Sequence, residues 1–168
     1  MIEIRGIRED DAERHLNLCY RLDRETNFML LEPGERTTTL EAHRERIRSI
    51  VGSPNSTIFL AEDRGEAAGY LAVFGGSANK TKHVGYIVIG IIEAYTGKGI
   101  GTSLFQAAEK WRADAGLTRF ELTVMVPNEP AVALYTKMGF EIEGVKKRSI
   151  RMEGRYIDEY YMGKTFDS

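Results

Sequence analysis

The sequence predicts an α/β fold in which a mixed sheet of seven strands is flanked by about four helices. The main observation is the order of its segments, β-α-α-β-β-β-α-β-α-β-β, read from the period of the apolar residues. The length is the second, because 168 residues suit one domain, so residues 1–168 are expected to form a single domain. The third is a composition of 42% apolar and 29% charged residues, which is typical of a soluble globular protein.

The first third of the chain predicts one strand and two helices. Residues 2–7 fit a strand, and Asp10 and Asp11 are expected to cap the helix that follows. Residues 26–34 break the helical pattern and are expected to form a loop. The inward positions of the first helix are Ala12, Leu16, Cys19 and Leu22, and those of a second helix, beginning near Thr39, are Leu40, Ile47, Ile50 and Val51.

The centre of the chain is rich in strands. Residues 57–62 and 68–74 flank a turn and fit an antiparallel hairpin, and residues 83–92 fit a long strand. An amphipathic helix follows and is expected to end at Gly116. Its apolar positions recur every three or four residues: Ile100, Leu104, Ala108, Trp111 and Ala115.

The last third predicts a strand, a helix and two more strands. Residues 120–126 alternate apolar with other side chains and fit a strand. Asn128 is expected to cap a helix that Gly139 ends. Residues 140–150 and 156–165 fit two strands joined by a turn.

The most informative segment is the loop Gly97-Lys98-Gly99-Ile100-Gly101, which joins a β-rich segment to a helix. Glycines let backbone N–H groups approach a ligand, and a helix N-terminus adds unpaired donors and about half a positive charge. The loop therefore suits a pyrophosphate. A P-loop needs four residues before its Gly-Lys pair, whereas six separate Gly90 from Gly97. A dinucleotide fingerprint reads Gly-x-Gly-x-x-Gly, which this loop does not match.

Two motifs resemble those of the GCN5-related N-acetyltransferase (GNAT) superfamily. The first is Thr96 to Gly101, where the superfamily has Arg/Gln-x-x-Gly-x-Gly/Ala and Thr96 replaces the Arg or Gln. The second runs from Asn128 to Tyr135 and on to Phe140. The resemblance implies a mixed, mostly antiparallel seven-stranded acyl-CoA N-acyltransferase fold. It also implies acetyl-CoA as co-substrate and direct attack of an amine on the thioester.

The resemblance further implies which residues contact acetyl-CoA. Ile91 and Glu93, with Ile92 between them, would pair with the pantetheine arm through their backbone. Asn128 and Ala131 of the second motif would contact the same co-substrate. The pyrophosphate would be held by the amides of the loop and the first helical turn: Gly97, Lys98, Gly99, Ile100, Gly101 and Thr102.

Tyr135 is the candidate general acid, because the resemblance implies that it faces the sulfur and a phenol of pKa about 10 is protonated at pH 7. A packing role is the alternative. The general base stays open between His83, Glu32 and a water relay. His83 shares strand parity with Ile91 and has a reference pKa of about 6.5. Glu32, like Glu25, belongs to the region between the first two helices that usually lines the acceptor site in this superfamily.

The expected acceptor is a small primary amine such as an amino acid, an analogue or a polyamine. A protein N-terminus or a lysine is the second class, and a non-catalytic acyl-CoA sensor is the rival interpretation. A net charge of −2 gives no reason to expect nucleic acid or a membrane as a partner. Three separated histidines and one cysteine match no zinc site, so no metal is expected. We expect a cytoplasmic protein, for which a homodimer is an option because dimers are frequent in the superfamily.

Overall fold

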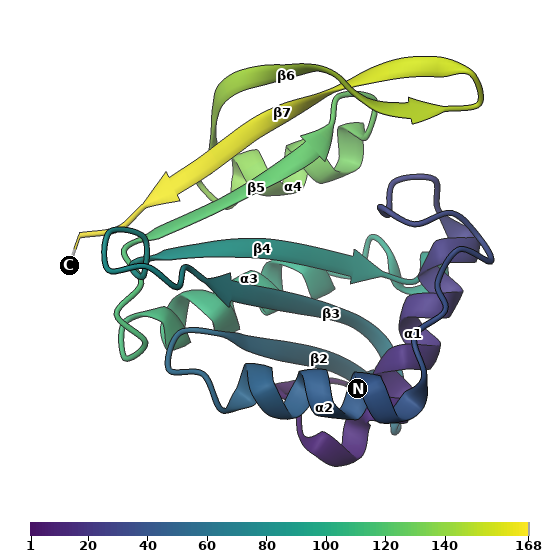
Figure 1. Ribbon diagram of the computed structural model, residues 1–168, viewed down its shortest axis with the longest axis vertical. Coiled ribbons are helices and arrows are strands. Elements are labelled where there is room, and N and C mark those ends of the chain that lie inside the picture. Colours follow the sequence, from purple (N-terminus) through teal and green to yellow (C-terminus); the bar gives the residue numbers. More distant parts are fainter. Residues whose placement is uncertain (168) are drawn as a thin grey trace.

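The structure, a computed structural model that describes residues 1–167, contains one seven-stranded sheet with helices on both faces (Figure 1). This confirms the predicted fold class. The strands are β1 (Ile2–Gly6), β2 (Thr57–Asp63), β3 (Glu66–Gly75), β4 (Val84–Ile91), β5 (Arg119–Met125), β6 (Glu141–Met152) and β7 (Arg155–Thr165). The helices are α1 (Ala12–Glu25), α2 (Leu40–Val51), α3 (Ile100–Arg112) and α4 (Glu129–Lys137), with 3₁₀ turns at Glu9–Asp11 and Glu93–Tyr95.

The strand order divides the sheet into two arms. The order is β1-β2-β3-β4-β5-β7-β6, and all neighbours run antiparallel except β4 and β5, which run parallel. These two strands pair only from Val84 to Tyr86 of β4 and from Arg119 to Glu121 of β5. Beyond Tyr86 they diverge, which Figure 1 shows as the opening between β4 and β5. The first four strands and the last three therefore form separate arms at that end.

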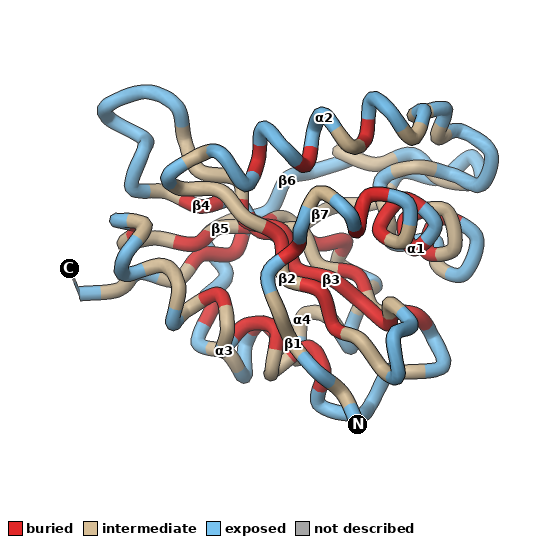
Figure 2. Tube along the Cα trace, turned by 90° about the horizontal axis from the view of Figure 1, so that it is seen from below, coloured by how far each residue is buried: buried red, intermediate tan, exposed pale blue. Residues whose placement is uncertain are grey.

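Helices cover the two faces of the first arm. α1 and α2 pack on one face and α3 on the other, and consecutive strand residues point to opposite faces, so β4 serves two cores. Ile87, Ile89 and Ile91 pack with α3, whereas Val88 packs with α1 and α2. Figure 2 shows that buried residues follow the strands and the inward sides of the helices. Among residues 1–167, none of the helices is both long enough and apolar enough to cross a membrane.

Two helix starts differ from the prediction. Asp11 does not cap α1 with its side chain, because a 3₁₀ turn precedes the helix and the Asp11 carboxylate accepts the backbone N–H of Arg8 at 2.7 Å. Asn128 occupies the N-cap position of α4 as predicted, but its side chain makes no capping hydrogen bond. The Asn128 amide group is therefore not used by the helix.

Two helix ends differ as well. α3 ends at Arg112, about one turn before the predicted Gly116. Gly116 still has the positive φ (74°) of a residue that turns the chain away from a helix. Val51 was expected to face inward but is 43% exposed, because it lies in the last turn of α2 directly before Gly52.

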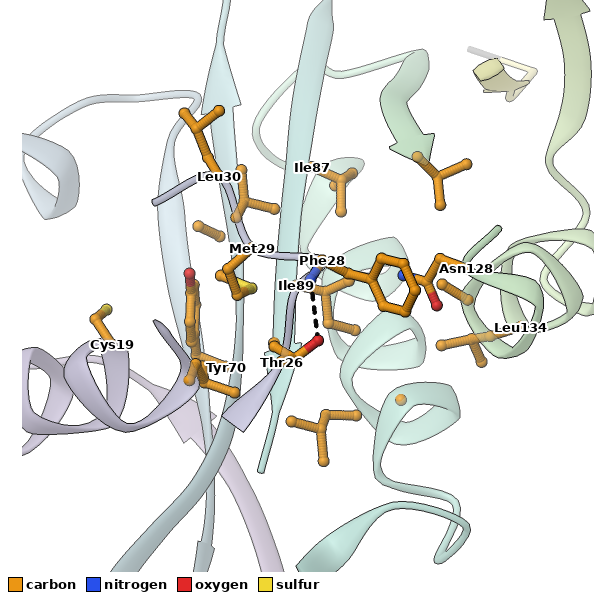
Figure 3. A pocket seen from close by; sticks show the side chains of 18 of the residues that line it. Cys19, Thr26, Phe28, Met29, Leu30, Tyr70, Ile87, Ile89, Asn128 and Leu134 are labelled. Atoms are coloured by element: carbon orange, nitrogen blue, oxygen red, sulfur yellow. Dashed lines mark hydrogen bonds between the residues drawn. The ribbon is translucent and has the colours of Figure 1, made fainter. Parts of the chain in front are cut away.

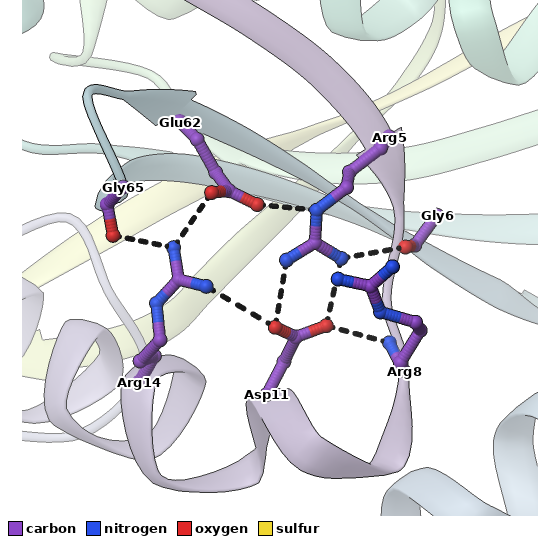
Figure 4. A network of polar contacts seen from close by, with 7 residues as sticks. All are labelled: Arg5, Gly6, Arg8, Asp11, Arg14, Glu62 and Gly65. Carbon is purple, nitrogen blue, oxygen red and sulfur yellow. Dashed lines mark hydrogen bonds and ion pairs between the residues drawn. The ribbon is translucent and has the colours of Figure 1, made fainter.

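A charged network joins α1 to the strands β1 and β2 (Figure 4). The buried Asp11 carboxylate accepts two hydrogen bonds from Arg5, at 2.8 and 2.7 Å, and one from Arg14 at 3.2 Å. Glu62 of β2 forms ion pairs with the same two arginines. Hydrogen bonding to Arg5 lowers the pKa of Asp11 to about 2, so its carboxylate is charged in the folded protein at neutral pH.

Candidate active site

The divergence of β4 from β5 leaves backbone hydrogen-bonding groups unpaired. Val84 O accepts from Gly76 N–H at 2.9 Å, and Ile92 N–H donates to Ala68 O at 3.0 Å. Hydrogen-bonded positions alternate along an antiparallel pair of strands. The backbone N–H and C=O groups of the even-numbered residues of β4 therefore bond to β3, and those of the odd-numbered residues face the β5 side. The N–H and C=O groups of Ile89 and Ile91 therefore lie on an open edge, because the described chain places no strand there.

The start of α3 presents a second set of free amides. The first intrahelical bond of α3 is from Ser103 N–H to Gly99 O, at 3.1 Å. Within the described residues, the N–H groups from Gly97 to Thr102 donate to no backbone or side-chain oxygen. Six consecutive unpaired donors at a helix N-terminus make a site for a phosphate or pyrophosphate. This agrees with the predicted loop chemistry.

The three glycines of this loop serve two physical purposes. Gly97 and Gly99 have φ angles of 74° and 80°, a region that residues with a Cβ rarely occupy. Gly101 is needed for space, because a Cβ there would lie 2.6 Å from Leu134 Cδ2. The loop is thus shaped by conformation at two positions and by contact with α4 at the third.

Side chains of α3 and α4 border the same end of the cleft. Lys137 Nζ lies 3.4 Å from Thr102 Oγ1, which places an ammonium group beside the free amides. Asn128 and Ala131 line the cleft as well. Lys98 is not among the lining residues, and its ammonium group lies 5.2 Å from the centroid of the Tyr95 ring.

One cleft of about 1230 Å³ connects the two faces of the sheet through the gap between β4 and β5. The α3/α4 wall carries the glycine loop, Asn128 and Leu134. The opposite wall is formed by α1, α2 and the loop that follows α1, from which Phe28 projects toward Asn128 (Figure 3). The volume exceeds that of an ordinary drug-sized pocket, so the cleft has room for a long ligand and a second, smaller one.

Tyr135 lies in this cleft on α4 and is 7% exposed. Its ring packs edge-on against Phe105, with ring centroids 5.8 Å apart. No described residue forms a hydrogen bond with its hydroxyl group. Burial, and to a lesser degree the nearby Tyr86, raise the pKa of Tyr135 well above its usual value, so the phenol is protonated at neutral pH.

The predicted cofactor residues line the cleft except Lys98 and Ile92, and Glu93 lines it with its N–H group already paired. Ile92 does not contribute to the open edge, because its N–H group donates to Ala68 O on β3; its side chain is fully buried in the α1/α2 core. Glu93 N–H is already taken, because it donates to Glu25 Oε1 at 2.9 Å. The free backbone groups on this edge belong to Ile89 and Ile91.

The two predicted bases lie outside the cleft. His83 precedes β4 and is exposed; the parity with Ile91 is correct, but eight residues of strand separate the two by about 26 Å. Glu32 is exposed in the loop after α1, and its side chain does not line the cleft. The carboxylates that do line it are those of Glu25, Glu93 and Glu159. The structure therefore does not support the expectation that His83 faces the cleft.

Glu159, Tyr86 and Thr123 are cleft residues that the sequence did not reveal. The Tyr86 and Thr123 hydroxyl groups are 3.0 Å apart across the two diverging strands. Glu159 pairs with Met125 in the β5–β7 register. No local signal could have found these residues, because three strands bring them together.

A buried polar cluster lies at the α1/α2 end of the cleft. His15 Nδ1 is 2.8 Å from His43 Nε2, and Cys19 Sγ is 3.9 Å from His15 Nε2. Burial lowers the pKa of His15 to about 3 and raises the pKa of Cys19 to about 11, so both are uncharged at pH 7. The cluster is a neutral wall. In residues 1–167, no three His, Cys, Asp or Glu side chains form a group that could hold a metal ion.

The fold and the cleft offer room and hydrogen-bonding groups for an elongated, phosphorylated ligand beside a smaller one. Comparison with known proteins gives the family of this protein. Residues 16–140 match the acetyltransferase (GNAT) family. A GNAT-family acetyltransferase from Streptococcus pneumoniae has a structure similar over 99% of this chain and 100% of its own, with a TM-score of 0.95 and 32% identity. The chain therefore belongs to the GNAT family of acetyltransferases.

Two further relatives add detail about other members. L-amino acid N-acetyltransferase AaaT of Escherichia coli is 33% identical over 105 residues, or 60% of this chain and 62% of that protein. The match thus spans less than two thirds of that relative. The structure of yncA, a putative acetyltransferase from Salmonella typhimurium with its cofactor acetyl-CoA, covers 99% of this chain and 94% of its own, with a TM-score of 0.87 and 16% identity. At that identity, the likeness shows the fold.

Proposed function

We propose that this protein is an acetyl-CoA-dependent N-acetyltransferase for small primary amines, with amino acids and their analogues as the first acceptor class. The observation that carries the proposal is the run of free amides from Gly97 to Thr102, which leads to the open edge of β4. A diphosphate and an extended amide-bearing arm need these two features in this order. The name of the Escherichia coli relative supports the acceptor class.

Each part of the co-substrate has candidate partners in the cleft. The pyrophosphate is assigned to the amides from Gly97 to Thr102, with Lys137 adding a positive charge. The pantetheine amides are assigned to Ile89 and Ile91, whose peptide groups are free, rather than to Glu93. Asn128 and Ala131 line the same wall. Acetyl-CoA supplies the activated acetyl group.

Acetyl transfer forms a C–N bond and breaks the C–S bond, so nitrogen must lose a proton and sulfur must gain one. Tyr135 is assigned to the sulfur, because its buried phenol is protonated and has no partner among the described residues. Reference pKa values of about 10 and 8.5 make full transfer to a thiolate uphill by about 2 kcal/mol in water. Tyr135 therefore acts largely by hydrogen bonding to the leaving thiolate, which takes its proton from water.

The base is assigned to a cleft carboxylate instead of His83 or Glu32. At pH 7, neutralising the α-amine of a peptide costs about 1–1.5 kcal/mol, against about 4–5 for a lysine. In a free amino acid the adjacent carboxylate raises the amine pKa, so the cost lies between these two values and a base assists the reaction. Glu159 then accepts the proton that nitrogen loses after the attack. Glu25 is less suitable, because hydrogen bonds from Glu93 N–H and Arg21 lower its pKa.

Calorimetry with acetyl-CoA, followed by a free-thiol assay with an amine panel, tests the proposal. We expect acetyl-CoA to bind without an amine and amino acids to release thiol. Tyr135→Phe should lower kcat by about tenfold or more and leave the acetyl-CoA Kd unchanged, since only the hydroxyl group is lost. The matched control is Tyr156→Phe, which removes a hydroxyl group from an exposed tyrosine of β7 outside the cleft.

The outcomes separate the alternatives. An absence of binding heat would refute the proposal at its base. Binding without thiol release from any amine would instead favour a non-catalytic acyl-CoA sensor. Release of thiol only with peptides that offer an N-terminal or lysine amine would show that the acceptor is a protein.

We also propose a cytoplasmic location and a homodimer. The single cysteine, Cys19, is free and buried, which suits a reducing compartment. The proposed dimer contact is the exposed apolar surface of the β6–β7 hairpin around Ile142 and Val145, which lie on the same face of the sheet. Size-exclusion chromatography with light scattering measures the oligomeric state.

A further inference from the structure

The acceptor side of the cleft carries a cationic side chain with no ion-pair partner. Arg46 of α2 lines the cleft, is exposed, and holds its guanidinium 5.7 Å from the centroid of the Phe74 ring. None of the ion pairs within residues 1–167 includes it. Arg36 also lines the cleft, but its guanidinium bonds to both Asp23 oxygens, at 2.7 and 3.1 Å. Arg46 is therefore the guanidinium of this wall that remains available.

The groups around Arg46 leave its charge uncompensated. His43, on the same helix, is buried, and this burial together with the charges of Arg46 and Arg36 lowers its pKa. His15, packed against His43, is likewise neutral at pH 7. Neutral imidazoles and a neutral Cys19 thiol do not attract cations, so this part of the cleft favours an anionic group.

The acidic side chains of the cleft lie elsewhere. Glu25 ends α1 and is bonded to Glu93 N–H, and Glu159 belongs to β7 in the second arm. The charges of the acceptor space are thus separated. The carboxylates lie at the β4–β5 gap and in the second arm, and the positive charge of Arg46 lies on α2. Between them, the loop after α1 contributes apolar side chains: Phe28, Met29, Leu30 and Leu31. Such a space fits an amine that also carries an anionic group and an apolar side chain.

We propose that Arg46 binds the carboxylate of the acceptor and makes the enzyme selective for amino acids over the same amines without a carboxylate. A guanidinium forms two parallel hydrogen bonds with a carboxylate, which also fixes the direction of the bound molecule. The amine then points away from α2, toward the β4–β5 gap where Tyr135 lies. This inference rests on the proposed acetyltransferase function and specifies its acceptor.

The test compares free L-amino acids with their C-terminal amides, using leucine, methionine and phenylalanine in both forms. The variant is Arg46→Gln, and the matched control is Arg44→Gln, which removes an arginine of the same helix that does not line the cleft. The amine pKa differs between an amino acid and its amide, so absolute rates are not compared. For each protein, kcat/KM for the acid is divided by kcat/KM for the amide, and this acid-to-amide ratio of each variant is compared with the ratio of the unaltered protein.

Arg46→Gln is expected to lower that ratio by about 10- to 100-fold, mainly through KM for the acids, because a charged hydrogen bond is lost. The ratio should stay the same in Arg44→Gln, and the acetyl-CoA Kd should stay the same in both. A ratio within twofold in Arg46→Gln, or an equal loss in both variants, would overturn the inference.

Two other results also overturn it, and they distinguish it from the proposed function. If the unaltered protein acetylates the amides but not the acids, or only polyamines or peptides, it is an acetyltransferase and Arg46 has another role. If it neither binds acetyl-CoA nor releases thiol with any amine, both proposals fail together.

Discussion

Glu159 lies on β7 opposite Met125, on the face of the sheet that also carries Thr123 and Tyr86. Val124, between Thr123 and Met125, points the other way into the α3 core. An amine that enters from the α1/α2 face therefore approaches Glu159 before it reaches the α3 face. This placement makes Glu159 the candidate proton acceptor.

Glu159→Gln is expected to lower kcat by about 100-fold, because general base catalysis contributes about 10²–10⁴ and the amide cannot take a proton. The acetyl-CoA Kd should not change, since the side chain lies away from the glycine loop. The matched control is Glu32→Gln, the loop carboxylate that the structure places outside the cleft, and it should retain kcat. Steady-state kinetics with a saturating amino acid measure both variants, and a kcat within twofold of normal in Glu159→Gln would remove it from the mechanism.

Residues of the candidate site could be proposed from sequence only where the motif is local. Tyr135 and the loop from Gly97 to Thr102 each belong to one continuous segment that a chemical pattern marks. Glu159 became visible only through the register of β7 on β5. His83 shares the strand parity of Ile91 but lies at the opposite end of the strand. Parity shows which face a side chain is on, not how far along the strand it lies.

Helix α3 is the element that gives the glycine-rich loop its unpaired amides. Its N-cap, Gly99, adopts a left-handed conformation and directs the following amides out of the helix end. Gly116, beyond its other end, has a similar φ of 74°, and a Cβ added there would meet no atom within 4 Å. Both glycines therefore adopt a positive φ angle, at opposite ends of the same helix.

Gly99→Ala and Gly116→Ala form a matched pair. Each introduces a Cβ at a positive φ and should reduce stability by about 1 kcal/mol, with similar shifts in Tm. Only Gly99→Ala should weaken acetyl-CoA binding, by about tenfold or more, because relaxing the strain re-aims the free amides. Calorimetry and thermal melts measure the two effects. Equal affinities in the two variants would contradict the role assigned to the loop.

The period of the apolar residues predicts the helices and strands more reliably than it predicts the turns and strand pairings that join them. The apolar repeat of α3 and the alternation in β5 correctly indicated a helix and a strand. The 3₁₀ turn before α1 escaped prediction. Asp11, which ends this turn, is bonded by Arg5 from a strand and by Arg14 from a helix, and contacts between separate elements leave no local sequence signal. The sequence predicted a mixed sheet but not which strands run parallel, because pairing between distant segments leaves no periodic signal.

The shape of the cleft depends on how α1 is attached to the sheet, since this helix and the loop after it form one wall of the cleft. The network of Asp11, Arg5, Arg14 and Glu62 provides that attachment at the start of α1 (Figure 4). Asp11 is 3% exposed and accepts hydrogen bonds from both arginines. A buried carboxylate with several donors is costly to replace.

Asp11→Asn is expected to lower stability at pH 7 by about 2 kcal/mol, or Tm by about 4–8 °C. The folded pKa of about 2 lies below the unfolded value of 3.8, so this stabilisation is present above pH 4 and is lost as pH falls toward 2. The difference between variant and unaltered protein should therefore shrink at pH 2–3. Thermal melts across pH measure it, with Asp10→Asn, an exposed neighbour, as the control. A pH-independent difference would mean that charge is not the cause.

The bare edge of β4 has a consequence for inhibitor chemistry. The peptide groups of Ile89 and Ile91 repeat at about 6.7 Å, which is the spacing of alternate amides in any extended peptide. A short peptidomimetic can add itself there as an eighth strand without adenine, ribose or phosphate. Seated between the two arms, it would block both reactants at the one place where they have to meet.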